Sequence, residues 1–143
     1  MDDNRQDDNR DNNCDNSYQL DFDPRALARI RISKYGPRRV FDSQRTDKLV
    51  CGLHLKNQHG DRPLLTGKLK LDVTFYIRIK RTNKKSKPNA PHCYAPDLDN
   101  MLKFLCDLMT NSIIKDDRLI YEITCRKLWS RVGKTIFTVT EVK

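Results

Sequence analysis

Two close pairs of aspartates stand out in a strongly basic chain. Asp97 and Asp99 lie two positions apart in "PDLDN", and Asp116 and Asp117 are adjacent in "KDDRL". If folding brings the two pairs together, carboxylates about 4 Å apart repel one another by roughly 4 kcal/mol at an effective dielectric constant near 20. A bound cation would relieve that repulsion, and carboxylate oxygens without His or Cys favour Mg²⁺ or Mn²⁺ over zinc. The spacing therefore predicts a divalent-metal site or, as the alternative, a helix cap and an exposed turn.

The residues around these pairs predict the elements that have to position them. Asp99, Lys103 and Asp107 follow at four-residue steps and so share one polar edge of a helix. Strand patterns precede and follow this helix at residues 68–80 and 117–129, so the unit predicts a β-α-β crossover, right-handed if the strands are parallel. The buried stripe of the helix is predicted at Leu98, Met101, Leu102, Leu105, Leu108 and Met109.

Weaker patterns predict three further elements. Residues 27–33 and 134–142 alternate as strands do, and residues 43–57 favour a helix with Ser43 as its N-cap. One face of that helix would carry Leu49, Val50 and Leu53. Together the patterns predict a small single domain of the α+β (mixed α/β) class, with a mixed β-sheet and about two helices.

Composition narrows the classes of protein to consider. The chain has 143 residues, a formal net charge of +9 and five scattered cysteines without a CxxC pair, which favours a reducing, intracellular setting and a polyanionic partner. No apolar run is long enough to span a bilayer, so no membrane partner is expected. Residues 1–17 carry six Asp against two Arg, a net charge of −4 that leaves +13 on the rest. This segment is predicted to be a disordered tail, either solubilising or shielding a basic face, and residues 18–143 form the domain.

A basic loop directly precedes Asp97. Such a cluster would neutralise DNA phosphates without reading bases, although a charge run also fits a solvated loop. Tyr94 and Trp129 are candidates for stacking on exposed bases, while a lone Trp in a strand is more often part of the core. The candidate DNA contacts are Arg78, Lys80, Arg81, Lys84, Lys85 and Lys87, with Arg38, Arg39 and Arg45 as weaker candidates.

Zinc binding is an unfavoured alternative. Cys51 and His54 form a C-x-x-H pair with His59 nearby, and His92 is followed by Cys93. Neither group is completed by a second CxxC or HxxxH pair, as a structural zinc site would require. We therefore expect these residues to be ordinary parts of the fold.

The acidic region resembles a known family. Residues 96–127, "PDLDNMLKFLCDLMTNSIIKDDRLIYEITCRK", resemble the central signature of the RusA-type endodeoxyribonucleases, the Holliday junction resolvases of bacteria and their phages. The shared pattern is D-x-D-N-x-x-K, an Asp one turn later, and a D-D pair opening the next strand. Upstream segments resemble the family less specifically, and the Asp/Asn-rich extension departs from it.

This resemblance implies a function and specific roles. The family acts as a homodimer with Mg²⁺, each protomer nicking one of two opposed strands at a four-way junction, and Mn²⁺ is expected to substitute. The essential metal-binding carboxylates would be Asp97, Asp99 and Asp117, and the essential basic residue would be Lys103. Supporting roles would fall to Asp116, as a further metal ligand, Asn100 and Asp107.

The sequence thus predicts a RusA-like, Mg²⁺-dependent endonuclease that resolves four-way junctions in DNA recombination and repair. Two alternatives stay open. One is a nuclease for flaps or other branched DNA, and the other is a non-catalytic, basic nucleic-acid-binding module whose acids only cap helices.

Overall fold

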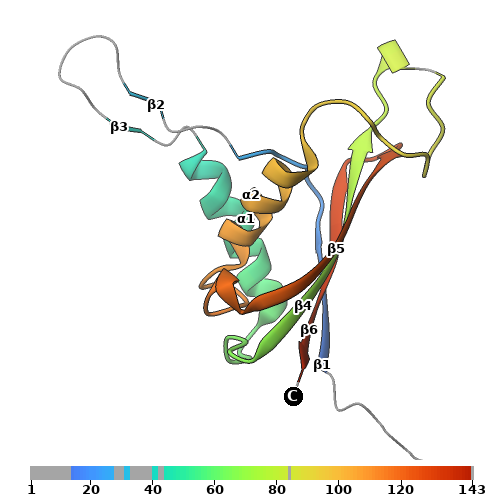
Figure 1. Ribbon diagram of the computed structural model, residues 1–143. Coiled ribbons are helices and arrows are strands. Elements are labelled where there is room, and N and C mark those ends of the chain that lie inside the picture. Colours follow the sequence, from blue (N-terminus) through green and yellow to red (C-terminus); the bar gives the residue numbers. More distant parts are fainter. Residues whose placement is uncertain (1–13, 28–30, 33–39, 42–43, 84, 143) are drawn as a thin grey trace, which may run out of the picture.

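The computed structural model describes residues 14–27, 31–32, 40–41, 44–83 and 85–142 (Figure 1). A four-stranded sheet and two α-helices dominate this part of the chain. The elements in chain order are β1 (Cys14–Leu20), β2 (Arg31–Ile32), β3 (Val40–Phe41), α1 (Arg45–His59), β4 (Lys68–Arg78), the 3₁₀ turn η1 (Arg81–Asn83), α2 (Leu98–Met109), the 3₁₀ turn η2 (Asp117–Leu119), β5 (Ile120–Ser130) and β6 (Lys134–Val142).

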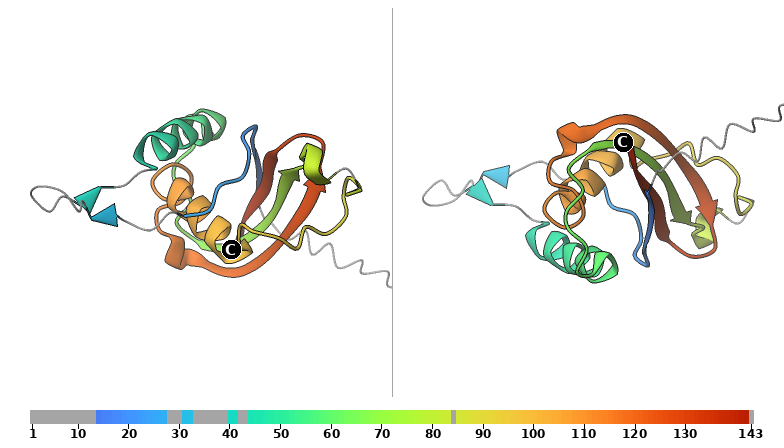
Figure 2. Two further views of the ribbon diagram at one scale, coloured as in Figure 1. Left: turned by 90° about the horizontal axis from the view of Figure 1, so that it is seen from above. Right: turned by 90° about the horizontal axis from the view of Figure 1, so that it is seen from below.

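The sheet is mixed, with strand order β1-β6-β4-β5. β4 and β5 are parallel and joined through α2, whereas β6 runs antiparallel to both β4 and β1. Both helices lie on the same face of the sheet, and no described helix covers the other face (Figures 1 and 2). The predicted α+β domain and its β-α-β unit are therefore confirmed. Within the described residues neither helix is long and apolar enough to cross a membrane.

β4 forms the centre of the core, as its alternating sequence predicts. Leu69, Leu71, Val73 and Phe75 are all buried, with at most 2% of their surface exposed. Each such side chain contributes about 1.5–3 kcal/mol when it is removed from water. The strand ends at Arg78, two residues before the predicted end. The basic loop that follows is held along β5 by hydrogen bonds from the amides of Asn89 and His92 to the carbonyls of Trp129 and Lys127.

α2 presents most of the predicted buried face. Its buried side is made by Met101, Phe104, Leu105, Leu108 and Met109, which pack on the sheet and on α1. Phe104 was not predicted, and the predicted Leu98 and Leu102 are only partly buried. The predicted polar edge is solvent-exposed, because Asp99, Lys103 and Asp107 keep 71%, 63% and 47% of their side-chain surface. The helix therefore fixes these charged groups on the surface without burying them.

α1 uses a different face from the predicted one. It begins at Arg45 with Gln44 at the N-cap, and Ser43 lies outside the described residues. Its buried residues are Cys51, Leu55 and His59, spaced four apart. The predicted apolar face is wrong, because it is the exposed one: Leu49, Val50 and Leu53 keep 61%, 43% and 59% of their surface. Cys and His occur both in cores and at surfaces. The buried side of α1 contains only one aliphatic residue, Leu55, so its sequence pattern does not indicate which face is buried.

The N-terminal strand begins inside the predicted tail. β1 starts at Cys14, so residues 14–17 pair with β6 and are not part of a disordered segment, while residues 1–13 lie outside the described residues. Tyr18 and Leu20 are buried against the core. The Tyr18 hydroxyl donates to Nδ1 of His59 at 2.7 Å, and Nε2 of His59 donates to the Pro63 carbonyl at 2.9 Å. This chain of hydrogen bonds ties β1 to the last turn of α1.

Two other strand predictions have mixed outcomes. Of the strand predicted at 27–33, only residues 31–32 are described as a strand, paired antiparallel with β3. The predicted strand at 117–129 is confirmed in its main part, but residues 117–119 form η2 and the strand runs from Ile120 to Ser130. The strand predicted at 134–142 is confirmed as β6.

Candidate active site

The first acidic pair lies at the N-terminus of α2. Asp97 occupies the N-cap without a hydrogen bond from its side chain to the helix, and Asp99 lies in the first turn. Lys103 follows one turn later, with its Nζ 3.9 Å from Oδ2 of Asp99. The helix N-terminus carries a partial positive charge, which stabilises nearby carboxylates by about 0.3–1 kcal/mol at a surface. Two exposed carboxylates and one ammonium are thus held together at one helix end.

Asn100, which follows Asp99 in the motif, helps to fix the helix end through its backbone. The backbone carbonyl of Asn100 accepts a hydrogen bond from the Leu27 amide at 3.0 Å. This bond ties the N-terminal end of α2 to the segment that follows β1. It therefore fixes the helix end that carries Asp97 and Asp99.

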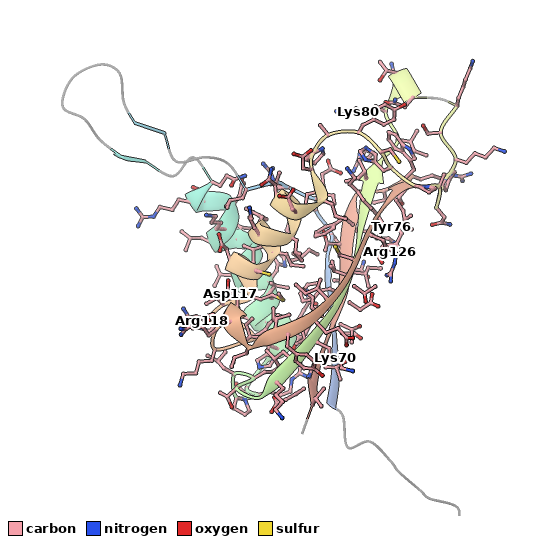
Figure 3. All side chains as sticks on the ribbon, viewed as in Figure 1. Lys70, Tyr76, Lys80, Asp117, Arg118 and Arg126 are labelled. Carbon is pink, nitrogen blue, oxygen red and sulfur yellow. The ribbon has the colours of Figure 1, made fainter. Side chains whose placement is uncertain are left out.

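The second acidic pair lies at the other end of α2. The connection after the helix is held by Leu65, whose amide donates to the Ile113 carbonyl at 2.9 Å and whose carbonyl accepts from the Lys115 amide at 3.0 Å. Ile113 and Ile114 are completely buried. This anchored connection places Asp117 at the start of η2, just before β5 and beside the C-terminal half of α2 (Figure 3).

Asp116 is engaged by its neighbour. Its carboxylate accepts hydrogen bonds from the Arg118 guanidinium at 2.8 and 3.1 Å and from the Arg118 amide at 2.9 Å. The side-chain hydrogen bonds from Arg118 are the main reason why the pKa of Asp116 falls to about 2. The carboxylate is therefore ionised at neutral pH, but its oxygens already have a cationic partner.

A single chain does not bring the predicted metal ligands together. Among the residues described, no three His, Cys, Asp or Glu side chains lie close enough to hold a metal ion. The reason is topological, because the helix that joins two parallel strands runs back along them, so its two ends lie near opposite ends of the strands. The charge of Asp117 helps to raise the pKa of Cys106, and Cys106 is seven residues, about 10 Å of helix, beyond Asp99. Since Mg²⁺ binds oxygens at about 2.1 Å, the oxygen donors have suitable chemistry but not a common position.

The acids around Cys106 affect its thiol. Burial is the largest cause that raises the pKa of Cys106 to about 11, and the carboxylates of Asp117 and Asp107 add to it. Asp107 itself also lies 3.8 Å from the Lys48 ammonium on α1. The Cys106 thiol is therefore protonated at neutral pH and unsuited to bind a metal or to attack a substrate.

The basic loop contains exposed charges near the first acidic pair. Lys80 lies past the end of β4 (Figure 3), and Arg81, Lys85 and Lys87 follow in the loop that leads towards α2. None of these four forms an ion pair within the described part of the chain, whereas Arg78 pairs with Asp23 at 3.4 Å. Lys84, Arg38 and Arg39 lie outside the described residues, and Arg45 opens α1.

A residue that the sequence did not suggest holds this loop in place. The Lys127 ammonium on β5 donates to the carbonyls of Tyr94 and Pro96 at 2.5 and 2.7 Å, and the Lys127 carbonyl accepts from the His92 amide at 3.0 Å. Lys127 thus fixes the chain immediately before Asp97. Its role depends on which residues of β5 lie beside the loop, and the sequence alone does not indicate this.

The residues considered for zinc take part in packing. Both ring nitrogens of His59 are hydrogen-bonded, and the His54 ring packs edge-on against Phe22 with centroids 5.1 Å apart. Cys51 is buried, which raises the pKa of its thiol. His92 is buried while Cys93 is exposed. These residues therefore act as parts of the fold.

Comparison with known proteins identifies the class. A two-layer α+β domain that sets acids and a lysine on one helix end beside a basic loop has the features of a nuclease. The family model of "Endodeoxyribonuclease RusA" matches residues 21–140, and the chain belongs to this family. It is also 27% identical over 94 residues to "Uncharacterized protein YqaN" of Bacillus subtilis (strain 168), a match that covers 60% of this chain and 66% of that relative, just under two thirds of its length.

Proposed function

We propose that this protein is a divalent-metal-dependent, structure-selective DNA endonuclease that resolves four-way junctions by paired nicks during recombination and repair. The observation that carries the proposal is the family match over residues 21–140 together with the acid–lysine helix end beside exposed basic residues. The expected products carry a 5′-phosphate and a 3′-hydroxyl. The expected partner is branched DNA, and the expected location is within the cell, with the DNA.

The described residues support a division of labour. The basic loop would hold the phosphate backbone beside the N-terminus of α2. Lys103 would place a fixed positive charge where negative charge develops on the phosphate. A divalent cation, Mg²⁺ or Mn²⁺, supplies Lewis-acid and water-activating chemistry when it is bound. Because one chain does not gather Asp97, Asp99 and Asp117, we assign no reaction step to that ion.

A nicking assay tests the function. End-labelled four-way junction, flap and linear duplex are each incubated with Mg²⁺, with Mn²⁺ and with a chelator. We expect metal-dependent paired nicks on the junction and little cutting of the other two. Preferred cutting of flaps would favour the branched-DNA alternative. Binding without any cutting would favour the non-catalytic module and refute the proposal.

Substitutions test the assigned residues. Asp97→Asn, Asp99→Asn and Asp117→Asn should each abolish nicking while junction binding is kept. Asp61→Asn is a matched control, because Asp61 is an exposed aspartate in the turn after α1, and it should cut normally. Full nicking by any of the three variants would remove that residue from the site.

We further propose that the protein works as a homodimer. Two features support this: the carboxylates of one chain lie apart, and Leu49, Val50 and Leu53 leave an apolar face of α1 exposed. Exposed apolar patches of this kind commonly mark protein interfaces. Sedimentation should find a dimer, and Leu49→Asp with Leu53→Asp should shift it to a monomer.

Mixing inactive variants tests whether two chains share a site. If one chain supplies Asp99 and the other supplies Asp117, a mixed dimer of Asp99→Asn and Asp117→Asn keeps one site intact and nicking returns. If each chain supplies both residues, every site in the mixture stays defective and no nicking returns. Mixing Asp97→Asn with Asp99→Asn is the control that should stay inactive in either case, because these two residues lie at the same helix end.

A further inference from the structure

A cavity of about 430 Å³ opens beside the first acidic pair. It lies where β4 and β5 end, under the loop that leads to α2. Its size is within the range of about 300–1,000 Å³ that is usual for small-ligand sites. Pro96, which directly precedes Asp97, is part of its wall. The other residues that matter here are Arg78, Lys80, His92, Tyr94 and Trp129.

Three aromatic rings form one wall of the cavity. The His92 ring packs edge-on against Trp129 with centroids 4.3 Å apart, and Tyr94 lies 5.9 Å from His92 and 6.2 Å from Trp129. Trp129 is only 6% exposed, whereas Tyr94 keeps 67% of its surface. The two buried rings therefore support Tyr94 and leave much of its surface free to stack on a ligand.

The wall also contains a polar atom without a partner. His92 is 6% exposed, and its Nδ1 is the one buried side-chain nitrogen or oxygen without a hydrogen-bond partner in the described chain. Burial, with a smaller effect from the Lys127 ammonium, lowers the pKa of His92, so the ring is neutral at pH 7. A buried polar group left without a partner is costly, and ligands often supply what is missing.

Basic side chains complete the cavity. Arg78 lines it at the end of β4 and Lys80 just beyond that end. Arg78 is paired with Asp23, whose side chain also lines the cavity, whereas Lys80 forms no ion pair among the described residues. The wall nearest α2 is fixed, because the Lys127 ammonium holds the carbonyls of Tyr94 and Pro96. A ligand that suits this cavity has a flat π-face, hydrogen-bonding edges and an attached anion.

We propose that this cavity takes up one unstacked nucleobase of branched DNA, with its face on Tyr94 and its phosphate towards Lys80. This inference rests on the proposed function and adds to it a contact that distinguishes branched DNA from duplex. Aromatic side chains bind bases of any sequence in this way, and nearby cations strengthen the contact. The position next to Asp97 would place the neighbouring backbone at the acid–lysine end of α2.

Binding measurements with Tyr94 variants test the proposal. A labelled four-way junction and a duplex of equal length are titrated in chelator with the wild-type protein, Tyr94→Ala and Tyr94→Phe. Loss of one stacked base should weaken junction binding roughly 5- to 150-fold in Tyr94→Ala. Tyr94→Phe keeps the ring and should bind as the wild type does. Duplex binding should be the same for all three proteins.

Tyr121→Ala is the matched control. Tyr121 is 58% exposed, but it lies at the start of β5, away from the cavity. This variant removes the same chemical group and should leave junction binding unchanged. If Tyr94→Ala and Tyr121→Ala behave alike, the proposal is refuted.

Photocrosslinking gives a second readout. 5-Iododeoxyuridine placed at the branch point should crosslink to His92, Tyr94 or Trp129, as mapped by mass spectrometry, and a duplex with the same base should not. Crosslinks only to other parts of the chain would refute the cavity as the base site. If the wild-type protein neither binds nor nicks the junction, the proposed function fails as well. If it nicks and Tyr94→Ala binds normally, only the present inference fails.

Discussion

The basic loop gives a quantitative prediction for DNA binding. Arg81, Lys85 and Lys87 are exposed and form no ion pair among the described residues, so each is available to a phosphate. Each phosphate neutralised contributes about 0.9 to the slope of log K against log salt concentration on duplex arms. Replacing all three by Gln should therefore reduce the steepness of that slope by about 2.7. Between 50 and 200 mM salt, the wild type should lose roughly 40-fold more affinity than the variant.

The assay is fluorescence anisotropy of a labelled four-way junction in chelator, at five or more salt concentrations. A matched control replaces Lys56, Lys68 and Lys70 by Gln, which changes the net charge by the same amount. Lys68 begins β4, and the strand's 11 residues place it about 36 Å from the basic loop. The control should keep the wild-type slope. An unchanged slope in the loop variant, or an equal change in the control, would refute the assignment of the loop to phosphate contact.

Three further predictions concern the scaffold. Tyr18→Phe leaves Nδ1 of His59 buried without its donor, so urea unfolding should show a loss of about 1–3 kcal/mol, and a loss under 0.5 kcal/mol would contradict the hydrogen bond. Leu55→Ala should cost about 2–5 kcal/mol because Leu55 is fully buried, whereas Asn57→Ala, on an exposed position of the same helix, should change the free energy of unfolding by less than about 0.5 kcal/mol. Similar losses would contradict the orientation of α1. The pKa of Cys106 is raised to about 11 in the folded protein, so the folded state holds the thiol proton more tightly than the unfolded state does. The free energy of unfolding should therefore fall as the pH rises from 9 towards 11. Urea unfolding at a series of alkaline pH values should show this decline in the wild type and not in Cys106→Ser.

The parts of the fold that could be predicted are those whose apolar residues recur at a regular spacing. β4 alternates over its whole length and α2 repeats every three or four residues, and both signals arise from burial on one side. α1 was placed correctly but turned to the wrong face, because its buried stripe includes Cys51 and His59. β1 was overlooked because its alternation is short, with Asn16, Tyr18 and Leu20 as the residues that face inwards.

For the candidate site, the sequence predicted which residues are close in the chain but not which are close in space. Asp97, Asp99 and Lys103 are close in sequence and share one helix end, so local spacing was enough to group them. The position of Asp117 depends on the direction of α2 and on the connection held by Leu65. Both are set by how the sheet and the helix assemble, which local spacing does not show. Sequence proximity across a 12-residue helix therefore does not imply proximity in space.

The strand order has a consequence for synthesis of the protein. β6 lies between β1 and β4, although it follows both of them in the chain. While the chain is still on the ribosome, β1 has no neighbour until residues 134–142 leave the exit tunnel, and Tyr18 and Leu20 have no strand beside them. Non-local pairing of this kind is slow and leaves apolar edges open in the meantime. A chain stopped before β6 loses the partner of β1 and one of the two partners of β4 at once, so premature termination near the end should yield aggregates and not a shortened enzyme.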